Sequence, residues 1–274
     1  MRLFSRALAF AAFLSITGWS ASAQDFRVLV FSKTVGFRHS SIVDGTALVQ
    51  NLGAANNFAV DVTENANDFT LSNLLRYRVV VWLNTTGDVL DAIQETAFEA
   101  YIHSGRGYVG LHSATDTEYG WPFYGELVGG NAWFLNHPNI QSAQLNVEDH
   151  SHPSTAHLPG GGTFTDEWYN FRANPRPFVD VLVSIDESSY SGGNMGDHPM
   201  TWCHEFEGGR SWYTALGHRT ETYLSPAFQQ HLLGGILWAS EGVLPAPALP
   251  PVGLLVLILA VAGMGVVKLR RSER

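Results

Sequence analysis

The chain of 274 residues contains a single cysteine, Cys203. A lone cysteine cannot form an internal disulfide bond, so the stability of the fold depends on its packed core. The scarcity of thiols also excludes redox-active cysteine pairs and metal sites built from several thiolates. Cys203 lies in the alternating segment 200–206, which predicts a strand in which the thiol is buried and unreactive.

Basic residues are also scarce. Without the two terminal segments described below, the chain has 10 Lys and Arg against 24 Asp and Glu, a net charge of −14. This charge repels the phosphates of nucleic acids, so no nucleic-acid partner is expected. The glycine-rich pieces at 160–162 and 192–193 lack the Lys and following Ser or Thr of a phosphate-binding loop, which disfavours nucleotide binding.

Residues 1–23 have the pattern of an export signal. Arg2 and Arg6 form a basic start, residues 7–16 are apolar, and Ala21-Ser22-Ala23 is a cleavage site of small residues. We therefore expect the protein to be exported.

The C-terminal end, residues 252–274, is predicted to be a membrane anchor or sorting tail. The apolar residues 252–267 are followed by the basic residues Lys268, Arg270, Arg271 and Arg274. A helix of this apolar length spans about 24 Å, a little less than the roughly 30 Å hydrocarbon core, and snorkelling of Lys268 lengthens the span. The positive-inside rule keeps the basic end in the cytoplasm and places the body of the chain on the outer side of the membrane.

Residues 244–251, Leu-Pro-Ala-Pro-Ala-Leu-Pro-Pro, are predicted to be a stiff, extended linker. Together with the apolar segment and the arginine-rich end, they resemble C-terminal sorting tails of the PEP-CTERM type. The usual central glutamate of such tails is absent, since Ala246 and Ala248 stand where it would be. A plain tail anchor therefore fits as well, and processing of the tail would leave the protein at the cell surface or secreted. The flanking prolines and arginines disfavour a buried core helix.

The remaining residues, 24–243, are enough for one α/β domain. Their first half alternates apolar runs with helical patterns. Strands are predicted at 26–31, 58–62, 78–84 and 108–111, and helices at about 41–55, 68–75 and 92–101. This alternation implies right-handed crossovers and a parallel sheet.

The second half of the domain has a different pattern. Residues 139–147 and 178–185 alternate as antiparallel strands do. Strands at 201–206 and 211–216 flank Glu207-Gly208-Gly209-Arg210, which has the glycines of a tight hairpin turn. Residues 226–240 are predicted to form an amphipathic helix. The expected fold is therefore α/β, with a wound, mostly parallel sheet and added antiparallel strands in the second half.

Histidines follow two of the predicted parallel strands. His39 lies a few residues after strand 26–31, and His112 comes directly after strand 108–111. Loops after parallel strands gather at one edge of an open sheet, where ligands bind, so we expect the two imidazoles to share a cleft. An imidazole can transfer protons or bind metal, and a helix start near His39 favours its neutral form. The structural alternatives are a helix-cap role for His39 and a hydrogen bond from His112 to a loop carbonyl.

Six segments of the chain match one known family in their order along the sequence. They are Phe37-Arg38-His39, Gly110-Leu111-His112-Ser113-Ala114, His152-Pro153, Asp166-Glu167-Trp168-Tyr169, His198-Pro199-Met200-Thr201-Trp202, and Gly209-Arg210-Ser211-Trp212-Tyr213-Thr214-Ala215-Leu216-Gly217-His218. With these segments, residues 26–241 resemble the trehalose-utilisation (ThuA-like) domain family. The resemblance implies a flavodoxin-like fold related to class I glutamine amidotransferases, and an association with sugar metabolism.

The resemblance does not imply amidotransferase chemistry. In the amidotransferases a cysteine nucleophile occupies the sharp turn after a strand, and this chain has His112 in the corresponding segment with no cysteine near it. Ser113 is not an obvious replacement, because the Gly-x-Ser-x-Gly pattern of a serine hydrolase is missing.

Carboxylates and aromatic residues complete the candidate site. Aromatic faces stack on sugar rings while carboxylates bind hydroxyls or move protons, although a loop acid beside core aromatics has the same pattern. We predict the catalytic residues to be His112, as the proton-transfer group, with His39, Glu167 and His218. His204 ranks below His218 because it can be packed inside the sheet. Substrate contacts are expected from Arg38, Ser113, Asp166, Trp168, Tyr169 and Arg219.

No cofactor is assigned, and a divalent metal is one option. Asp149, His150 and His152 supply oxygen and nitrogen ligands of the kind that zinc prefers, but this spacing is equally typical of a polar turn.

The leading hypothesis is an exported, membrane-tethered enzyme that acts on a carbohydrate or polyol by histidine and carboxylate acid–base chemistry. Hydrolysis, isomerisation and elimination all fit these residues. The alternative is a non-catalytic module that binds glycans or acts as a scaffold at the cell surface.

Overall fold

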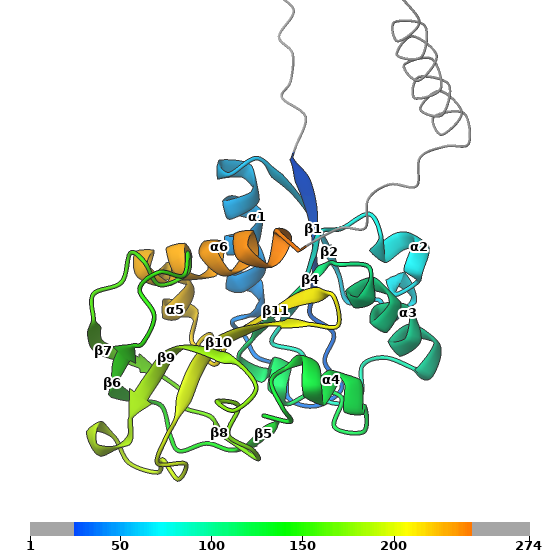
Figure 1. Ribbon diagram of the computed structural model, residues 1–274. Helices are drawn as coiled ribbons and strands as arrows, with labels where there is room; N and C mark the ends of the chain where they lie inside the picture. Colours follow the sequence, from blue (N-terminus) through cyan, green and yellow to red (C-terminus); the bar gives the residue numbers. More distant parts are fainter. Residues whose placement is uncertain (1–24, 243–274) are drawn as a thin grey trace, which may run out of the picture.

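A nine-stranded sheet runs through the molecule (Figure 1). Its strand order is β2 (Phe58–Thr63), β1 (Phe26–Phe31), β3 (Val79–Leu83), β4 (Gly107–Leu111), β11 (Gly209–Thr214), β10 (Pro199–Phe206), β9 (Asp180–Asp186), β6 (Gln141–Val147) and β7 (Gly161–Asp166). The computed structural model describes residues 25–242, so the predicted export signal, linker and C-terminal tail lie outside the described residues. Between residues 25 and 242, none of the helices has the length and apolar character needed to cross a lipid bilayer.

The first five strands of this order are parallel to one another. The alternation of strands and helices predicts this for β2, β1, β3 and β4, whereas β11 was predicted only as one strand of the antiparallel hairpin. β3 lies near the middle of this part, and all five of its residues are fully buried. An uninterrupted apolar run is what a strand needs when helices cover both faces of the sheet.

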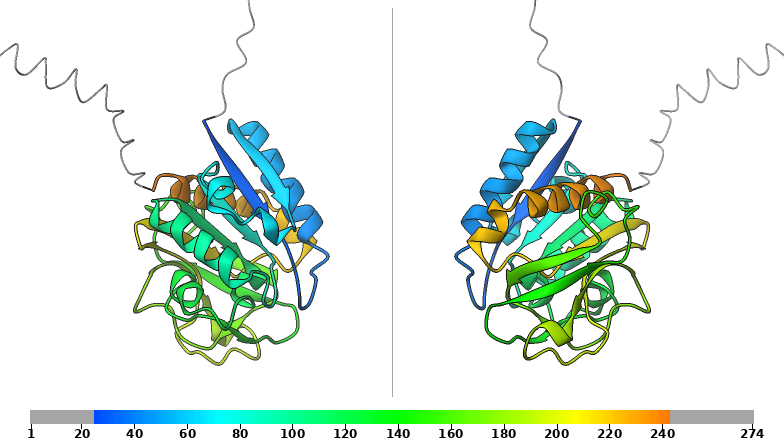
Figure 2. Two further views of the ribbon diagram at one scale, coloured as in Figure 1. Left: turned by 90° about the vertical axis from the view of Figure 1, so that its right-hand side faces the viewer. Right: turned by 90° about the vertical axis from the view of Figure 1, so that its left-hand side faces the viewer.

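Helices cover both faces of the parallel part (Figure 2). One face carries α1 (Ile42–Ala55), α5 (Thr220–Leu224) and α6 (Pro226–Ser240), and the other carries α2 (Leu71–Leu74), α3 (Ala92–His103) and α4 (Pro122–Leu127). Tyr108 of β4 contacts Phe98 of α3 and Tyr124 of α4 on the second face. On the first face, α6 approaches so closely that a Cβ atom on Gly107 would overlap the backbone of Ala239.

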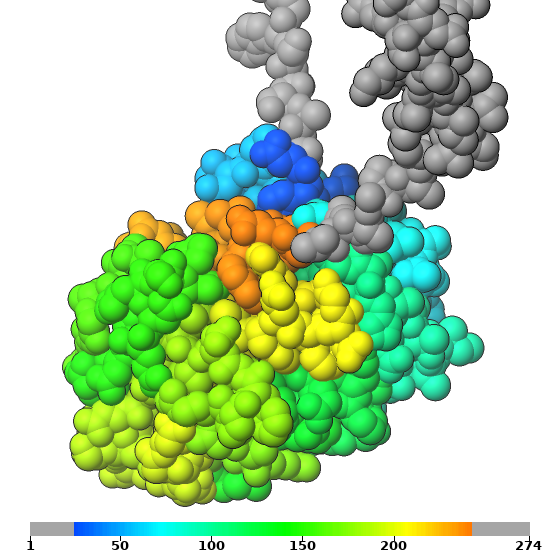
Figure 3. Space-filling model, viewed as in Figure 1, coloured from blue at the N-terminus to red at the C-terminus, as the bar shows by residue number. Residues whose placement is uncertain are grey.

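The antiparallel strands extend the sheet beyond β11. β10 and β11 form the predicted hairpin, and both residues of its turn have positive φ, +48° at Glu207 and +88° at Gly208. This is the arrangement of a two-residue turn that matches the twist of the strands. The hairpin lies against α6 on the surface (Figure 3), and Nη1 of Arg210 donates to the carbonyl oxygen of Trp238 at 3.0 Å.

Shorter elements complete the domain. They are a two-stranded sheet of β5 (Phe134–Asn136) and β8 (Asn170–Phe171), and the 3₁₀ turns η1 (Ala66–Asp68), η2 (His112–Thr115) and η3 (Glu187–Ser189). The α/β fold class, with a mostly parallel sheet and added antiparallel strands, is confirmed. Cys203 is buried in β10, and burial raises its thiol pKa to about 12, which makes it unreactive.

Candidate functional site

Four side chains predicted to be catalytic meet at one point in the fold. The ligand atoms of His39, His112, Glu167 and His218 all lie within 4.8 Å of one another. They come from the loop after β1, the first residue after β4, the first residue after β7 and the loop after β11. We call these four residues the histidine–carboxylate cluster. Three of them follow parallel strands, whose carboxyl ends meet at one edge of the sheet.

His112 is the innermost member of the cluster and has no solvent exposure. Its φ is +46°, in the left-handed region that non-glycine residues rarely adopt. The N–H at Nδ1 donates to the carbonyl oxygen of Ala215 at 2.8 Å. This bond fixes the tautomer, so in the neutral ring the lone pair at Nε2 points toward Oε2 of Glu167, 3.4 Å away.

Glu167 is the centre of the cluster. Its Oε2 lies 3.4 Å from Nε2 of His112 and 3.1 Å from Nδ1 of His218. Burial opposes ionisation of this carboxyl group, but the neighbouring imidazoles of His112 and His218 outweigh burial and hold its pKa well below the usual range. Glu167 is therefore a buried carboxylate.

The other two imidazoles have different environments. Burial, with the neighbouring imidazoles of His112 and His218, lowers the pKa of His39 to about 3, so its ring is neutral at pH 7. Its Nδ1 lies 3.3 Å from the hydroxyl of Ser113. His218 is 22% exposed, and the contact with Glu167 raises its pKa.

A further histidine, His137, contacts Glu167 and was not predicted from the sequence. Its Nδ1 lies 3.0 Å from Oε1 of Glu167, and its side chain is 40% exposed. It follows β5, a strand of only three residues, so no periodic pattern marks its position. The one signal in the sequence is a histidine before Pro138 in a loop, which is too common to identify a site.

Asp166 holds the backbone next to the cluster in place by hydrogen bonds. Its Oδ2 accepts the backbone N–H of Gly217 at 2.9 Å and the hydroxyl of Thr222 at 2.8 Å, and its Oδ1 accepts the N–H of Glu167 at 3.0 Å. Asp166 therefore ties the end of β7, which carries Glu167, to the loop that carries His218.

The remaining predicted substrate-contact residues occupy different environments. Tyr169 is buried with its ring centroid 4.2 Å from that of His112. Trp168 is fully buried and donates its indole N–H to the carbonyl oxygen of Gln141, so its faces pack in the core. Arg38 is exposed and pairs with Glu64, and Arg219 pairs with Glu221 and donates to the carbonyl oxygen of Thr165.

The alternative metal residues are not part of the cluster. The carboxylate of Asp149 accepts the N–H and hydroxyl of Ser151, and Nδ1 of His152 bonds to the hydroxyl of Ser154. Within residues 25–242, the cluster is the group of His, Cys, Asp and Glu side chains with the geometry to hold an ion. His204 is also separate, since its Nε2 bonds to the carbonyl oxygen of Leu127.

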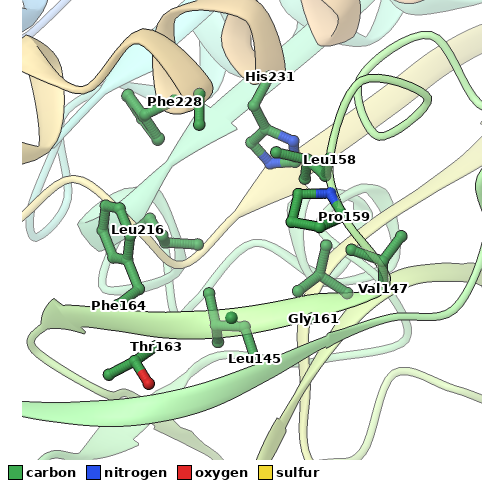
Figure 4. A pocket seen from close by; sticks show the side chains of 13 residues that line it. Leu145, Val147, Leu158, Pro159, Gly161, Thr163, Phe164, Leu216, Phe228 and His231 are labelled. Carbon is green, nitrogen blue, oxygen red and sulfur yellow. The ribbon is translucent and has the colours of Figure 1, made fainter.

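An apolar cavity of about 200 Å³ lies between α6 and the strands β6 and β7 (Figure 4). Phe228 and His231 line it from the helix, and Leu145 and Phe164 line it from the strands. Both ring nitrogens of His231 are engaged, Nδ1 with the carbonyl oxygen of Ser154 and Nε2 with the hydroxyl of Thr201. The cavity therefore offers shape and apolar surface but no reactive group, and the chemistry belongs to the cluster.

Comparisons with known proteins identify relatives of this chain. A ThuA-like protein from Bacteroides uniformis is similar in structure, with a TM-score of 0.70 at 24% identity over 84% of this chain and 95% of that one. A ThuA-like protein from Parabacteroides merdae gives a TM-score of 0.68 at 21% identity over 82% and 93% of the two chains. A β-galactosidase from Bacillus circulans shares the fold over 80% of this chain and 32% of its own, with a TM-score of 0.52 at 13% identity.

A search of curated proteins gave no match. The family model ThuA, described as trehalose utilisation, matches residues 27–239. This match spans most of the chain and includes all six of the sequence segments, so the protein belongs to the ThuA trehalose-utilisation family.

Proposed function

We propose that the protein is an enzyme that acts on a carbohydrate or polyol at the histidine–carboxylate cluster. The observation that carries the proposal is Glu167, a buried carboxylate in contact with His112, His218 and His137 at the carboxyl edge of the sheet. A structural role alone does not require so many ionisable groups around one buried charge, and perturbed groups of this kind are typical of catalytic sites. The family description, which names a disaccharide, supports the substrate class.

The histidines in and around the cluster differ in solvent exposure, and this difference suggests different roles. His39 and His112 are buried, whereas His218 and His137 are partly exposed. A substrate that approaches from solvent therefore meets His137, His218 and the carboxylate between them first. We assign proton transfer to His137, the most exposed of these groups, and the ordering of the carboxylate to His112 and His218, in place of proton transfer by His112 itself.

Replacement of the carboxylate tests this proposal. Glu167→Gln keeps the size of the side chain and removes its charge, and we expect turnover to fall by about 10²-fold or more. Activity would be assayed on a panel of disaccharides, their oxidised derivatives and polyols, with products detected by mass spectrometry. His103→Gln is the matched control, because His103 is an exposed histidine that pairs with Glu207 at 3.7 Å and should leave turnover unchanged. Equal turnover in Glu167→Gln and the wild type would contradict the proposal, as would saturable sugar binding with no product from any substrate.

We also propose that the domain acts outside the cytoplasmic membrane and is tethered to it. The support is the pattern of residues 1–23 and 252–274, a basic and apolar leader at one end and an apolar segment with a basic end at the other. External protease should digest the domain in spheroplasts with an intact inner membrane. Digestion only after lysis of that membrane would reject the proposed location.

A further inference from the structure

We propose that His39, His112, His218 and Glu167 bind one divalent transition-metal ion. The inference goes beyond the proposed enzymatic activity and does not depend on the substrate.

An unpaired nitrogen atom points into the cluster. Nε2 of His112 is buried without a hydrogen-bond partner, and His112 has no solvent exposure at all. Nδ1 of His218 faces the same carboxylate oxygen at 3.1 Å. A buried polar atom without a partner costs about 1–3 kcal/mol. Nε2 of His112 carries a lone pair, because Nδ1 donates to Ala215, and this lone pair faces the carboxylate. Nε2 of His112 and Oε2 of Glu167 are then two acceptors that face each other, and they need a cation between them, either a metal ion or a proton.

The distances around the carboxylate fit such a cation. Ligands about 2.1 Å from a tetrahedral ion lie about 3.4 Å from one another. Oε2 of Glu167 is 3.4 Å from Nε2 of His112 and 3.1 Å from Nδ1 of His218. The ligand atoms of the four side chains all lie within 4.8 Å of one another, so the widest pair exceeds the tetrahedral spacing by about 1.4 Å. Side-chain rotations that move these atoms together by this amount would close the site.

The hydrogen-bond partners of the ligand side chains are arranged as they are in protein metal sites. Histidines that bind a metal usually donate their other N–H to a carbonyl or another fixed acceptor, which orients the ring. Nδ1 of His112 donates to the carbonyl oxygen of Ala215, and Nδ1 of His39 lies next to the hydroxyl of Ser113. Oε1 of Glu167 contacts His137, which leaves Oε2 for the ion.

The ligand types select the class of metal. Mg²⁺ and Ca²⁺ prefer oxygen ligands, whereas imidazole suits Zn²⁺, Fe²⁺, Co²⁺ and Ni²⁺. Three imidazoles with one carboxylate therefore favour a transition-metal ion. The competing explanation is a proton in place of the ion, with one imidazolium paired to Glu167.

Metal content of the purified full-length protein separates these explanations. The protein would be stripped with a chelator, dialysed separately against Zn²⁺, Co²⁺, Ni²⁺, Mn²⁺ and, without oxygen, Fe²⁺, and its metal content measured by mass spectrometry. Visible absorption of bound Co²⁺ would report imidazole ligation. We expect one ion per chain in the wild type, and a loss of at least tenfold in affinity in His112→Ala and in Glu167→Gln. His150→Ala removes an exposed histidine outside the cluster and should bind as the wild type does.

Each outcome bears on the metal site alone. Circular dichroism would establish that the variants are folded, and the near-isosteric Glu167→Gln serves if His112→Ala does not fold. A wild-type protein that takes up none of these ions, or folded cluster variants that bind the ion as tightly as the wild type, would overturn the proposal. Because metal content is measured without substrate, a failed sugar assay leaves this result unaffected.

Discussion

His112 has a strained backbone conformation that places its side chain in the site. It is the first residue after β4, with a φ of +46°, and this turn directs its side chain toward Glu167. The left-handed conformation costs a non-glycine residue about 1 kcal/mol or more and persists only where the surroundings enforce it. Here the hydroxyl of Tyr213 donates to the carbonyl oxygen of His112 at 2.8 Å, which helps to hold the turn.

The strain at His112 reverses the usual order of two substitutions. In an ordinary helix alanine is more stable than glycine by about 1 kcal/mol, whereas at positive φ glycine is free of strain. We therefore expect His112→Gly to have a larger free energy of unfolding than His112→Ala by about 1 kcal/mol, measured by urea denaturation. The same pair at Thr96, an exposed residue inside α3, should show the opposite order. If alanine were the more stable residue at both positions, the turn would not be strained.

The sequence predicted the inner part of the site better than its rim. His39 and His112 each follow a predicted strand of the parallel sheet, and the rule that such loops meet at one edge was enough to group these two. His218 was added because it follows a strand of the predicted hairpin, in a segment that resembles the family, and the parallel pairing of that strand with β4 was not predicted. His137 follows a three-residue strand and depends on the long-range pairing of β5 with β8. The burial of Trp168 could not be predicted either, because this residue lies in an irregular segment between β7 and β8, where no alternation of polar and apolar residues shows which side chains point inward.

At the scale of elements, Asp166 connects β7 to the start of α5. The three donors around it are the N–H groups of Gly217 and Glu167 and the hydroxyl of Thr222. This carboxylate holds the backbone of Glu167 itself and that of Gly217, the residue before His218. The separation of 3.1 Å between Glu167 and His218 therefore depends on one buried hydrogen-bond acceptor.

Asp166→Asn should weaken this connection. The amide has one acceptor oxygen where the carboxylate has two, so at least one buried donor loses its partner, and we expect a loss of about 1–3 kcal/mol in the free energy of unfolding. Asp186→Asn is the matched control, because Asp186 also ends a strand and accepts hydrogen bonds from Ser188, but at a partly exposed position. Both variants would be measured by urea denaturation. Equal and small losses in the two variants would show that the acceptor at 166 is dispensable.

The elements of the first half follow from local patterns, and those of the second half do so only in part. The apolar run of β3 and the hairpin turn at Glu207 and Gly208 are local signals, and both elements were predicted. β7 was not predicted, because Gly161 and Gly162 are poor strand residues that are held here by pairing with β6. The parallel pairing of β11 with β4 places His218 beside His112, and this pairing joins segments about a hundred residues apart.

At the scale of the whole molecule, a second buried carboxyl group makes stability depend on pH. Glu118 is 2% exposed, and burial raises its pKa to about 7, although its Oε1 accepts the N–H groups of Val89 and Leu90 at 2.8 Å each. In the unfolded chain an ordinary glutamate has a pKa of about 4.3. The folded state therefore binds this proton more tightly than the unfolded state does.

The contribution of Glu118 is present in full below about pH 4.3 and is lost as pH rises through about 7, a difference of roughly 4 kcal/mol. Glu118→Gln keeps an oxygen for both N–H groups and removes the charge. The free energy of unfolding of the wild type, measured by urea denaturation, should therefore fall between pH 5 and pH 8 relative to that of Glu118→Gln by about 2–3 kcal/mol. Other titrating groups are common to both proteins and cancel in this difference.

Glu205→Gln, at a side chain that is 78% exposed, is the control, and its free energy of unfolding should change with pH as that of the wild type does. Parallel pH profiles for Glu118→Gln and the wild type would mean that Glu118 is already ionised in the folded protein at pH 5, held by its two backbone donors.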